Sequence, residues 1–534
     1  MKNKFMEGSP ILMGNNTIPG VSIPDDLQKL LPTIYKKVSE FGCDYYPTVV
    51  EMLTYDEISE IAAYGGFPVR YPHWKWGMEY EELQRGYMYG MHKIYELVIN
   101  TNPVYIYCLD SNTLVDNVTV VAHALGHADF FKNNIYFSQT SQNMMNQLAN
   151  HGARIRKYMS RWGRERVTEF IDHVLRIETL IDHSKAWQRK KVKNPIIKDH
   201  RVYRHPKRLK SRDDRDYMDE YLNPKDWIQN QKDRIEFLDT AEYLDIFSDP
   251  TKDIMRFIRD YAPLKPWEAD IVAMLYDESM YFSPQRLTKT INEGWASYVD
   301  YNIMARQGFT ALGQDHDSSG IIEYSHHKMG VLGGKYSMNP YKLGFCLFLD
   351  IEERWNKGQF GSEWENCEDL AQKENWDKKL NLGHEKVFEV RKFQNDLTLI
   401  MEYFTPEFCE KYEFFEWKKY PNGEYKIENR DFNKIKKKLI KKYTNGGLPE
   451  ISLVDHNHRG KKILFLEHQG DGRPLYDPYI RPVLQSLRYL WKNDVCLSTK
   501  ALDDTELVYK CMGDDLSIDI VDGRQYFSHS DVFE

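Results

Sequence analysis

One short segment constrains the fold of this chain more than any other. An apolar run at residues 104–108 is followed by a helical pattern, at about 113–131, that carries His123 and His127. The run predicts a strand and the periodicity predicts a helix. Residues four apart lie on one helix face, about 6 Å apart along the axis, so both imidazoles can reach one cation. A strand that leads into a histidine-bearing helix is the layout of zinc-hydrolase cores. We therefore expect a zincin-like strand and helix in the main body.

A second motif, INEGWASYVDY, adds a carboxylate. Periodicity predicts a helix over residues 292–304, with Glu293 on the same side as Asp300. Zinc enzymes often take their third ligand from a glutamate on a later helix. His123, His127 and Glu293 are therefore the predicted ligands of Zn²⁺ or another divalent metal. The alternative is that the two histidines are partly buried, hydrogen-bonded side chains that bind no metal.

The motif departs from the common zinc-protease pattern at one position. In H-E-x-x-H, the glutamate after the first histidine takes a proton from the attacking water, and here that position is Ala124. Hydrolysis would need a base from elsewhere, and the candidates are Asp129, Glu169, Asp300 and His326. Asp129 lies about 200° around the helix from His127, which makes it a poor ligand but leaves it able to cap or orient a neighbour. The sequence thus predicts either a zinc-dependent hydrolase without the usual glutamate or a non-catalytic protein whose metal site is structural or vestigial.

Around these residues the chain resembles the SpoVR family, the stage V sporulation protein R group. The shared motifs are long and specific, and they follow one another in family order from about residue 28 to residue 516. They include AAYGGFPVRYPHWKWGMEYEEL, VAHALGHADFFKNN, INEGWASYVDYNIM, NPYKLGFCLFLDIEERWNKGQFG and RPLYDPYIRPVLQSLRYLWKNDVCLST.

The resemblance implies a part in sporulation, in the formation of the peptidoglycan layer called the spore cortex. A hydrolase of this family would then act on a peptide, an amide or a cell-wall precursor. The resemblance also implies a link to a PrkA-like serine protein kinase in stress or stationary-phase signalling. In that context, the alternative is a regulatory or scaffold protein.

Two groups of side chains are candidates for lining a ligand pocket. Cationic and aromatic residues together favour anionic or sugar-like ligands, although such a cluster can also be a buried aromatic wedge with snorkelling charges. The first group contains Arg70, His73 and Trp74. The second group matches the family pattern beside the two metal motifs and contains Lys132, Asn133, Asn134 and Trp295.

Composition narrows the class of protein. The net charge of −8 argues against a general affinity for nucleic acid. The seven cysteines form no C-x-x-C pair, so the chain has neither a zinc ribbon nor a disulfide framework. The N-terminal residues lack the apolar stretch of a signal peptide, and no later run is long enough to cross a membrane. We expect a cytoplasmic protein.

We expect a predominantly helical α+β protein in five parts. Residues 1–24 are a flexible lead, 25–184 a helical section with the histidine motif, 185–216 a basic insertion, 217–420 a second helical section of the same main body, and 421–534 a small domain. The insertion is interpreted as a solvated loop, with nucleic acid or an anionic surface as the less favoured alternative. The last part has the predicted order α-β-β-α-β-β, with helices at 431–443 and from 478 onward.

Overall fold

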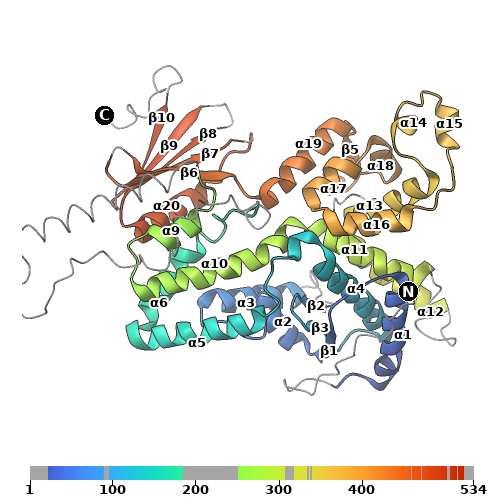
Figure 1. Ribbon diagram of the computed structural model, residues 1–534, viewed down its shortest axis with the longest axis horizontal. Coiled ribbons are helices and arrows are strands. Elements are labelled where there is room, and N and C mark those ends of the chain that lie inside the picture. The colour runs from blue at the N-terminus through green and yellow to red at the C-terminus, as the bar shows by residue number, and fades with distance from the viewer. Residues whose placement is uncertain are drawn as a thin grey trace, which may run out of the picture. The chain divides into compact units, whose positions relative to one another are not determined.

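The computed structural model describes residues 22–88, 96–184, 250–306, 318–333, 336, 339–458, 460–470, 472–501, 505–513 and 515–521 (Figure 1). The predicted basic insertion at 185–216 and most of the predicted lead at 1–24 lie outside these residues. Unit 1 comprises Met1–Thr168 and Met280–Leu448, and unit 2 comprises Glu169–Ser279 and Pro449–Glu534. The predicted domain boundaries stay predictions.

Unit 1 is built around a three-stranded sheet with the order β1-β3-β2. Strand β3 (Val104–Leu109) is the central strand, parallel to β1 (Thr48–Leu53) and antiparallel to β2 (Glu96–Ile99). The predicted strand at 104–108 is therefore confirmed, whereas β2 had not been predicted. Among the described residues β2 is an edge strand, because it pairs with β3 alone.

Helix α4 (Leu114–Asn133) follows β3 and carries the histidine motif, as predicted. The side chain of Thr113 caps it by accepting a hydrogen bond from the backbone N–H of Asp116 at 3.1 Å. Nearly every residue of α4 from Val115 onward is buried. A helix that is buried on nearly all sides lies inside the protein, and α4 is part of the core of unit 1.

Helix α11 (Lys289–Tyr301) packs on α4 and carries the second motif. It ends in a π-helical turn, Asn302–Arg306, where we had predicted one continuous helix. On its other side α11 packs on α13 (Pro340–Lys357), and the two helices touch through backbone at Gly294 and Gly344. A Cβ on either glycine would collide with the opposite backbone, so these positions require glycine.

Other helices surround this pair or extend unit 1. They are α1 (Asp25–Phe41), α2 (Tyr55–Ala63), α3 (Trp74–Met88), α5 (Met144–Trp162), α12 (Ser318–Leu332), α14 (Ser362–Glu365), α15 (Leu370–Glu374), α16 (Gly383–Phe393), α17 (Asp396–Tyr403), α18 (Pro406–Lys411) and α19 (Phe432–Tyr443). A hairpin of β4 (Glu416–Lys419) and β5 (Tyr425–Asn429), which had not been predicted, precedes α19.

Unit 2 contains a five-stranded sheet with the order β10-β9-β8-β7-β6. Its strands are β6 (Ile451–His458), β7 (Ile463–His468), β8 (Val495–Lys500), β9 (Glu506–Met512) and β10 (Asp515–Val521). Only β7 and β8 run parallel, and α20 (Asp477–Trp491) makes the crossover that parallel strands require. The predicted element order is present from α19 to β9, and β10 extends it.

Three more helices complete the described α-helices, namely α6 (Arg164–Leu175), α9 (Ile254–Tyr261) and α10 (Pro266–Leu287). The expectation of a predominantly helical α+β protein with a strand-rich C-terminal part is confirmed. No helix among the described residues is both long and apolar enough to cross a lipid bilayer.

Candidate metal centre

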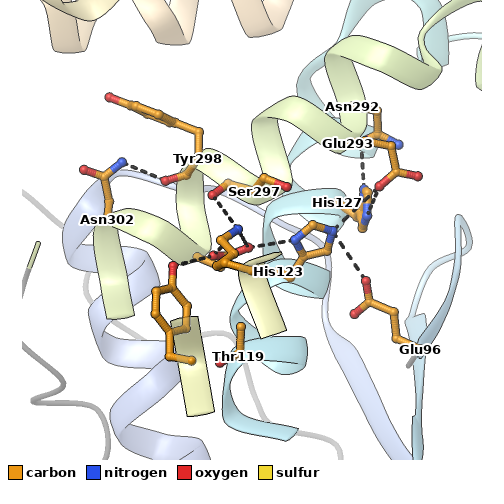
Figure 2. Close-up of polar contacts among 12 residues, drawn as sticks. Glu96, Thr119, His123, His127, Asn292, Glu293, Ser297, Tyr298 and Asn302 are labelled. Atoms are coloured by element: carbon orange, nitrogen blue, oxygen red, sulfur yellow. Dashed lines mark hydrogen bonds and ion pairs between the residues drawn. The ribbon is translucent and has the colours of Figure 1, made fainter. Parts of the chain in front are cut away.

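His123 and His127 lie one turn apart on α4, and both side chains are buried. Their ring centroids are 4.7 Å apart and the two rings are nearly perpendicular. The Nε2 atoms of both rings face a common set of carboxylates (Figure 2). The helical spacing predicted this pairing.

Glu293, the third predicted ligand, reaches both histidines from α11. Its Oε2 atom lies 3.4 Å from Nε2 of His127 and 3.7 Å from Nε2 of His123 (Figure 2). The fold therefore brings the three predicted ligands together, although Glu293 is far from the histidines in sequence.

A second carboxylate, that of Glu96, had not been predicted at the site. Glu96 is the first residue of β2, and its Oε1 atom lies 3.5 Å from Nε2 of His123 (Figure 2). Ligand atoms of Glu96, His123 and His127 all lie within 4.8 Å of one another, so this buried group could hold a metal ion. The only sequence signal was an acidic residue at the start of the short apolar run ELVI.

Each imidazole is held in place at its other nitrogen. Nδ1 of His123 lies 2.9 Å from Oδ2 of Asp300, and Nδ1 of His127 lies 2.9 Å from Oδ1 of Asn292. Because both partners offer an oxygen, the Nδ1–H of each ring donates, and Nε2 is the nitrogen that faces the carboxylates. Metal-binding histidines are typically oriented in this way.

The charges of the cluster depend on one another. Burial raises the pKa of Glu96, and His123 and His127 only partly offset this. Burial also opposes ionisation of Glu293, but the two histidines outweigh it and hold the pKa of Glu293 well below its usual range. Burial disfavours the charged form of His123, yet Glu96, Asp300 and Glu293 raise its pKa to about 10. The cluster therefore favours a bound positive charge, which a metal ion could supply in place of the proton.

Two further observations fit a metal ion. Tetrahedral zinc with bonds of about 2.0–2.1 Å places its ligand atoms about 3.3 Å apart, and Oε2 of Glu293 lies 3.4 Å and 3.7 Å from the two Nε2 atoms. In addition, Oε2 of Glu96 is buried and has no hydrogen-bond partner among the described residues. A buried carboxylate oxygen is costly unless a donor or a cation satisfies it.

The four candidate bases lie in different surroundings. Asp300 binds Nδ1 of His123, behind the ring. Asp129 accepts hydrogen bonds from the indole of Trp295 at 2.9 Å and from the backbone N–H of Asp44 at 2.8 Å, which favours a structural role. His326 is exposed on α12, and Glu169 belongs to unit 2. Asp300 therefore contacts a predicted ligand directly, through its hydrogen bond with His123.

The predicted pocket residues make contacts typical of packing. Trp295 is fully buried, and the Arg70 guanidinium lies 4.6 Å from the ring centre of Trp76. The remaining contacts are those of His73 with Trp74, Lys132 with Asp44, Asn133 with the carbonyl of Asp44, and Asn134 with the carbonyls of Arg391 and Gln394. The pocket itself stays a prediction.

Comparisons with known proteins agree with the sequence motifs. The family described as "SpoVR like protein" matches residues 23–448, and the one described as "SpoVR-like C-terminal domain" matches residues 449–501. A relative from Escherichia coli, "Uncharacterized protein YcgB", is 27% identical over 525 residues, which cover 91% of this chain and 94% of the relative. No solved structure matches the chain.

Proposed function

The chain belongs to the SpoVR-like protein family, and we propose that it is a metal-dependent hydrolase that acts on a peptide, an amide or a cell-wall precursor. The observation that carries the proposal is the convergence of two imidazole Nε2 atoms and two carboxylates from three separate elements, β2, α4 and α11. The succession of a strand, β3, and a histidine-bearing helix, α4, supports it.

In this proposal His123, His127 and Glu293 hold a Zn²⁺-type cation. Glu293 is suited to ligation because one of its oxygens approaches both Nε2 atoms and because its neighbours keep it ionised. Asp300 and Asn292 keep the imidazoles in the orientation that binding needs. When bound, such a cation lowers the pKa of a water ligand toward about 7 and polarises a carbonyl oxygen.

Glu96 takes the role of the glutamate that the motif lacks. Ala124 is buried, and its methyl group cannot accept a proton. Glu96 instead reaches the cluster from the edge strand β2, and one of its oxygens has no hydrogen-bond partner among the described residues. Its carboxylate accepts the proton of the attacking water and returns it to the leaving amine.

The proposed substrate class rests on the family resemblance, which implies a part in the formation of the spore cortex. Cortex peptidoglycan contains amide and peptide bonds, which a zinc-type hydrolase cleaves. We therefore propose a part in sporulation or in related cell-wall chemistry.

The test is metal analysis followed by hydrolase assays. Full-length protein purified without added ions should contain close to one equivalent of metal by plasma mass spectrometry. His123→Ala and His127→Ala should each lose it, whereas His384→Ala, which alters an exposed histidine of α16, should retain it. A His123→Ala protein with full metal content would contradict the ligation.

Glu96→Gln tests whether Glu96 is the base or one of the ligands, since it belongs to the buried group that could hold the ion. The amide keeps the size of the side chain but cannot accept the proton, so we expect metal content to persist and cleavage of peptidoglycan fragments to fall by about 100- to 10,000-fold. If the wild-type protein binds metal and cleaves none of a panel of peptides, amides and peptidoglycan fragments, the metal centre is structural and the hydrolase proposal is wrong.

A further inference from the structure

The carboxylate behind His123 is bound from three sides. Asp300 is 1% exposed. Besides the Nδ1–H of His123, it accepts a hydrogen bond from Nζ of Lys328, 2.7 Å from Oδ1, and one from the Tyr324 hydroxyl, 3.1 Å from Oδ1. These three donors fix the orientation of the carboxylate, and the carboxylate in turn fixes the orientation of the His123 ring.

Both additional donors come from one helix, α12. Tyr324, His327 and Lys328 form its buried inner side. Nδ1 of His327 lies 3.0 Å from Oδ1 of Asp116, in the first turn of α4. Ser325 and Met329 lie on the exposed outer side. Helix α12 therefore docks through polar contacts on the two helices that carry the metal cluster.

A buried lysine needs an explanation, because an ammonium group loses its hydration on burial and is rarely placed inside a protein without a partner. Lys328 is only 8% exposed, and its Nζ binds Asp300 and the carbonyl of Ser297. Without Lys328, the buried carboxylate of Asp300 would lose its ammonium partner. The lysine supplies an opposite charge, and its hydrogen bonds hold the Asp300 carboxylate directed at His123.

We propose that Lys328 and Tyr324 are positioning residues of the metal centre and that, acting through Asp300, they hold Nε2 of His123 toward the ion. The two histidines thereby differ, since His127 is oriented by the neutral amide of Asn292. The inference rests on the metal centre of the proposed function but does not depend on hydrolase activity.

The proposal has a reciprocal consequence. If docking of α12 increases the affinity for metal, binding of metal must stabilise docking of α12 by the same factor. Amide hydrogens of α12 should therefore exchange more slowly in the zinc-loaded protein than in the metal-free protein.

A double-mutant cycle on the full-length protein tests the route through Asp300. Zn²⁺ affinity is measured by chelator competition and the ligand field by the visible absorption of bound Co²⁺. Lys328→Met and Asp300→Asn should each weaken Zn²⁺ binding by about 10- to 100-fold and change the Co²⁺ spectrum. In the Asp300→Asn background, Lys328→Met should cause no further loss of Zn²⁺ affinity, because Lys328 acts on His123 through the Asp300 carboxylate, which is already absent.

Ser325→Ala is the matched control on the same helix, since among the described residues the Ser325 hydroxyl donates to the carbonyl of Ile321 alone. It should leave affinity and spectrum unchanged. Circular dichroism and the unfolding midpoint of the metal-free proteins establish folding. If Lys328→Met does not fold, Tyr324→Phe, which removes one oxygen atom, carries the test with a smaller expected loss.

Wild-type affinity in Lys328→Met, or losses that multiply in the double mutant, would overturn the proposal. A wild-type protein that takes up neither Zn²⁺ nor Co²⁺ would overturn both this inference and the metal centre. A protein that binds metal and follows the expected cycle but cleaves no substrate would refute only the hydrolase proposal.

Discussion

Gly126 of α4 lies directly against Ala296 of α11. A Cβ on Gly126 would stand 2.9 Å from Cα of Ala296 and 3.3 Å from Cβ of Val299, closer than side chains normally pack. On α4 this contact lies between His123 and His127, and on α11 it lies three residues after Glu293. Their contact therefore sets the separation between the imidazole and carboxylate atoms of the cluster.

Gly126→Ala should lower the free energy of unfolding by about 1–3 kcal/mol, because the added methyl group pushes α11 away from α4. The same displacement should weaken metal binding. Thermal or urea unfolding and metal analysis measure the two effects. Gly77→Ala is the control, because a Cβ at this position of α3 meets nothing within 4 Å and alanine favours a helix. Wild-type stability and metal content in Gly126→Ala would show that this contact does not determine the spacing of the metal-binding groups.

The histidine pair could be predicted because helix geometry is local. Four residues of helix place His123 and His127 side by side whatever surrounds them. Glu293 was predicted as the third ligand from its motif. The packing of α11 on α4 then brings its Oε2 atom to 3.4 Å from Nε2 of His127.

Glu96 could not be predicted, because its place depends on strand pairing. Strand β2 has four residues, too few for a clear periodic pattern, and Glu96 reaches the cluster only because β2 pairs with β3. The β4–β5 hairpin was missed for a similar reason, since its charged and mostly exposed strands show no apolar pattern.

Asp129→Asn should destabilise the protein without removing the metal. The carboxylate accepts hydrogen bonds from Trp295 and from the Asp44 backbone, and it lies 3.4 Å from Nε of the buried Arg391. The asparagine amide would place its NH₂ group against one of these N–H donors. It would also leave Arg391 without its counter-ion. We expect a loss of about 1–3 kcal/mol at neutral pH. Calorimetry and metal analysis check this, and loss of metal at unchanged stability would instead assign Asp129 to the site.

The metal-free protein should lose stability as the pH rises from about 6.5 to about 10. Its neighbours raise the pKa of His123 in the folded state to about 10, whereas the unfolded value is about 6.5. The contribution of the imidazolium is therefore complete below about pH 6.5 and is lost as the pH passes through the folded pKa. Urea unfolding in the presence of a chelator, compared with His123→Gln, measures it. If both proteins show the same pH dependence over this range, His123 is not the responsible group.

Removal of the metal should lower the stability of every variant that retains the cluster and of no variant that lacks it. A ligand that binds only the folded chain stabilises it by about 2.7 kcal/mol at a free concentration 100 times its Kd. Addition of a chelator should therefore lower the unfolding midpoint of the wild-type protein and of His384→Ala. The midpoint of His127→Ala should not change, because this variant has lost one of the two imidazoles that face Glu293. An equal shift in His127→Ala would place the stabilising ion elsewhere in the chain.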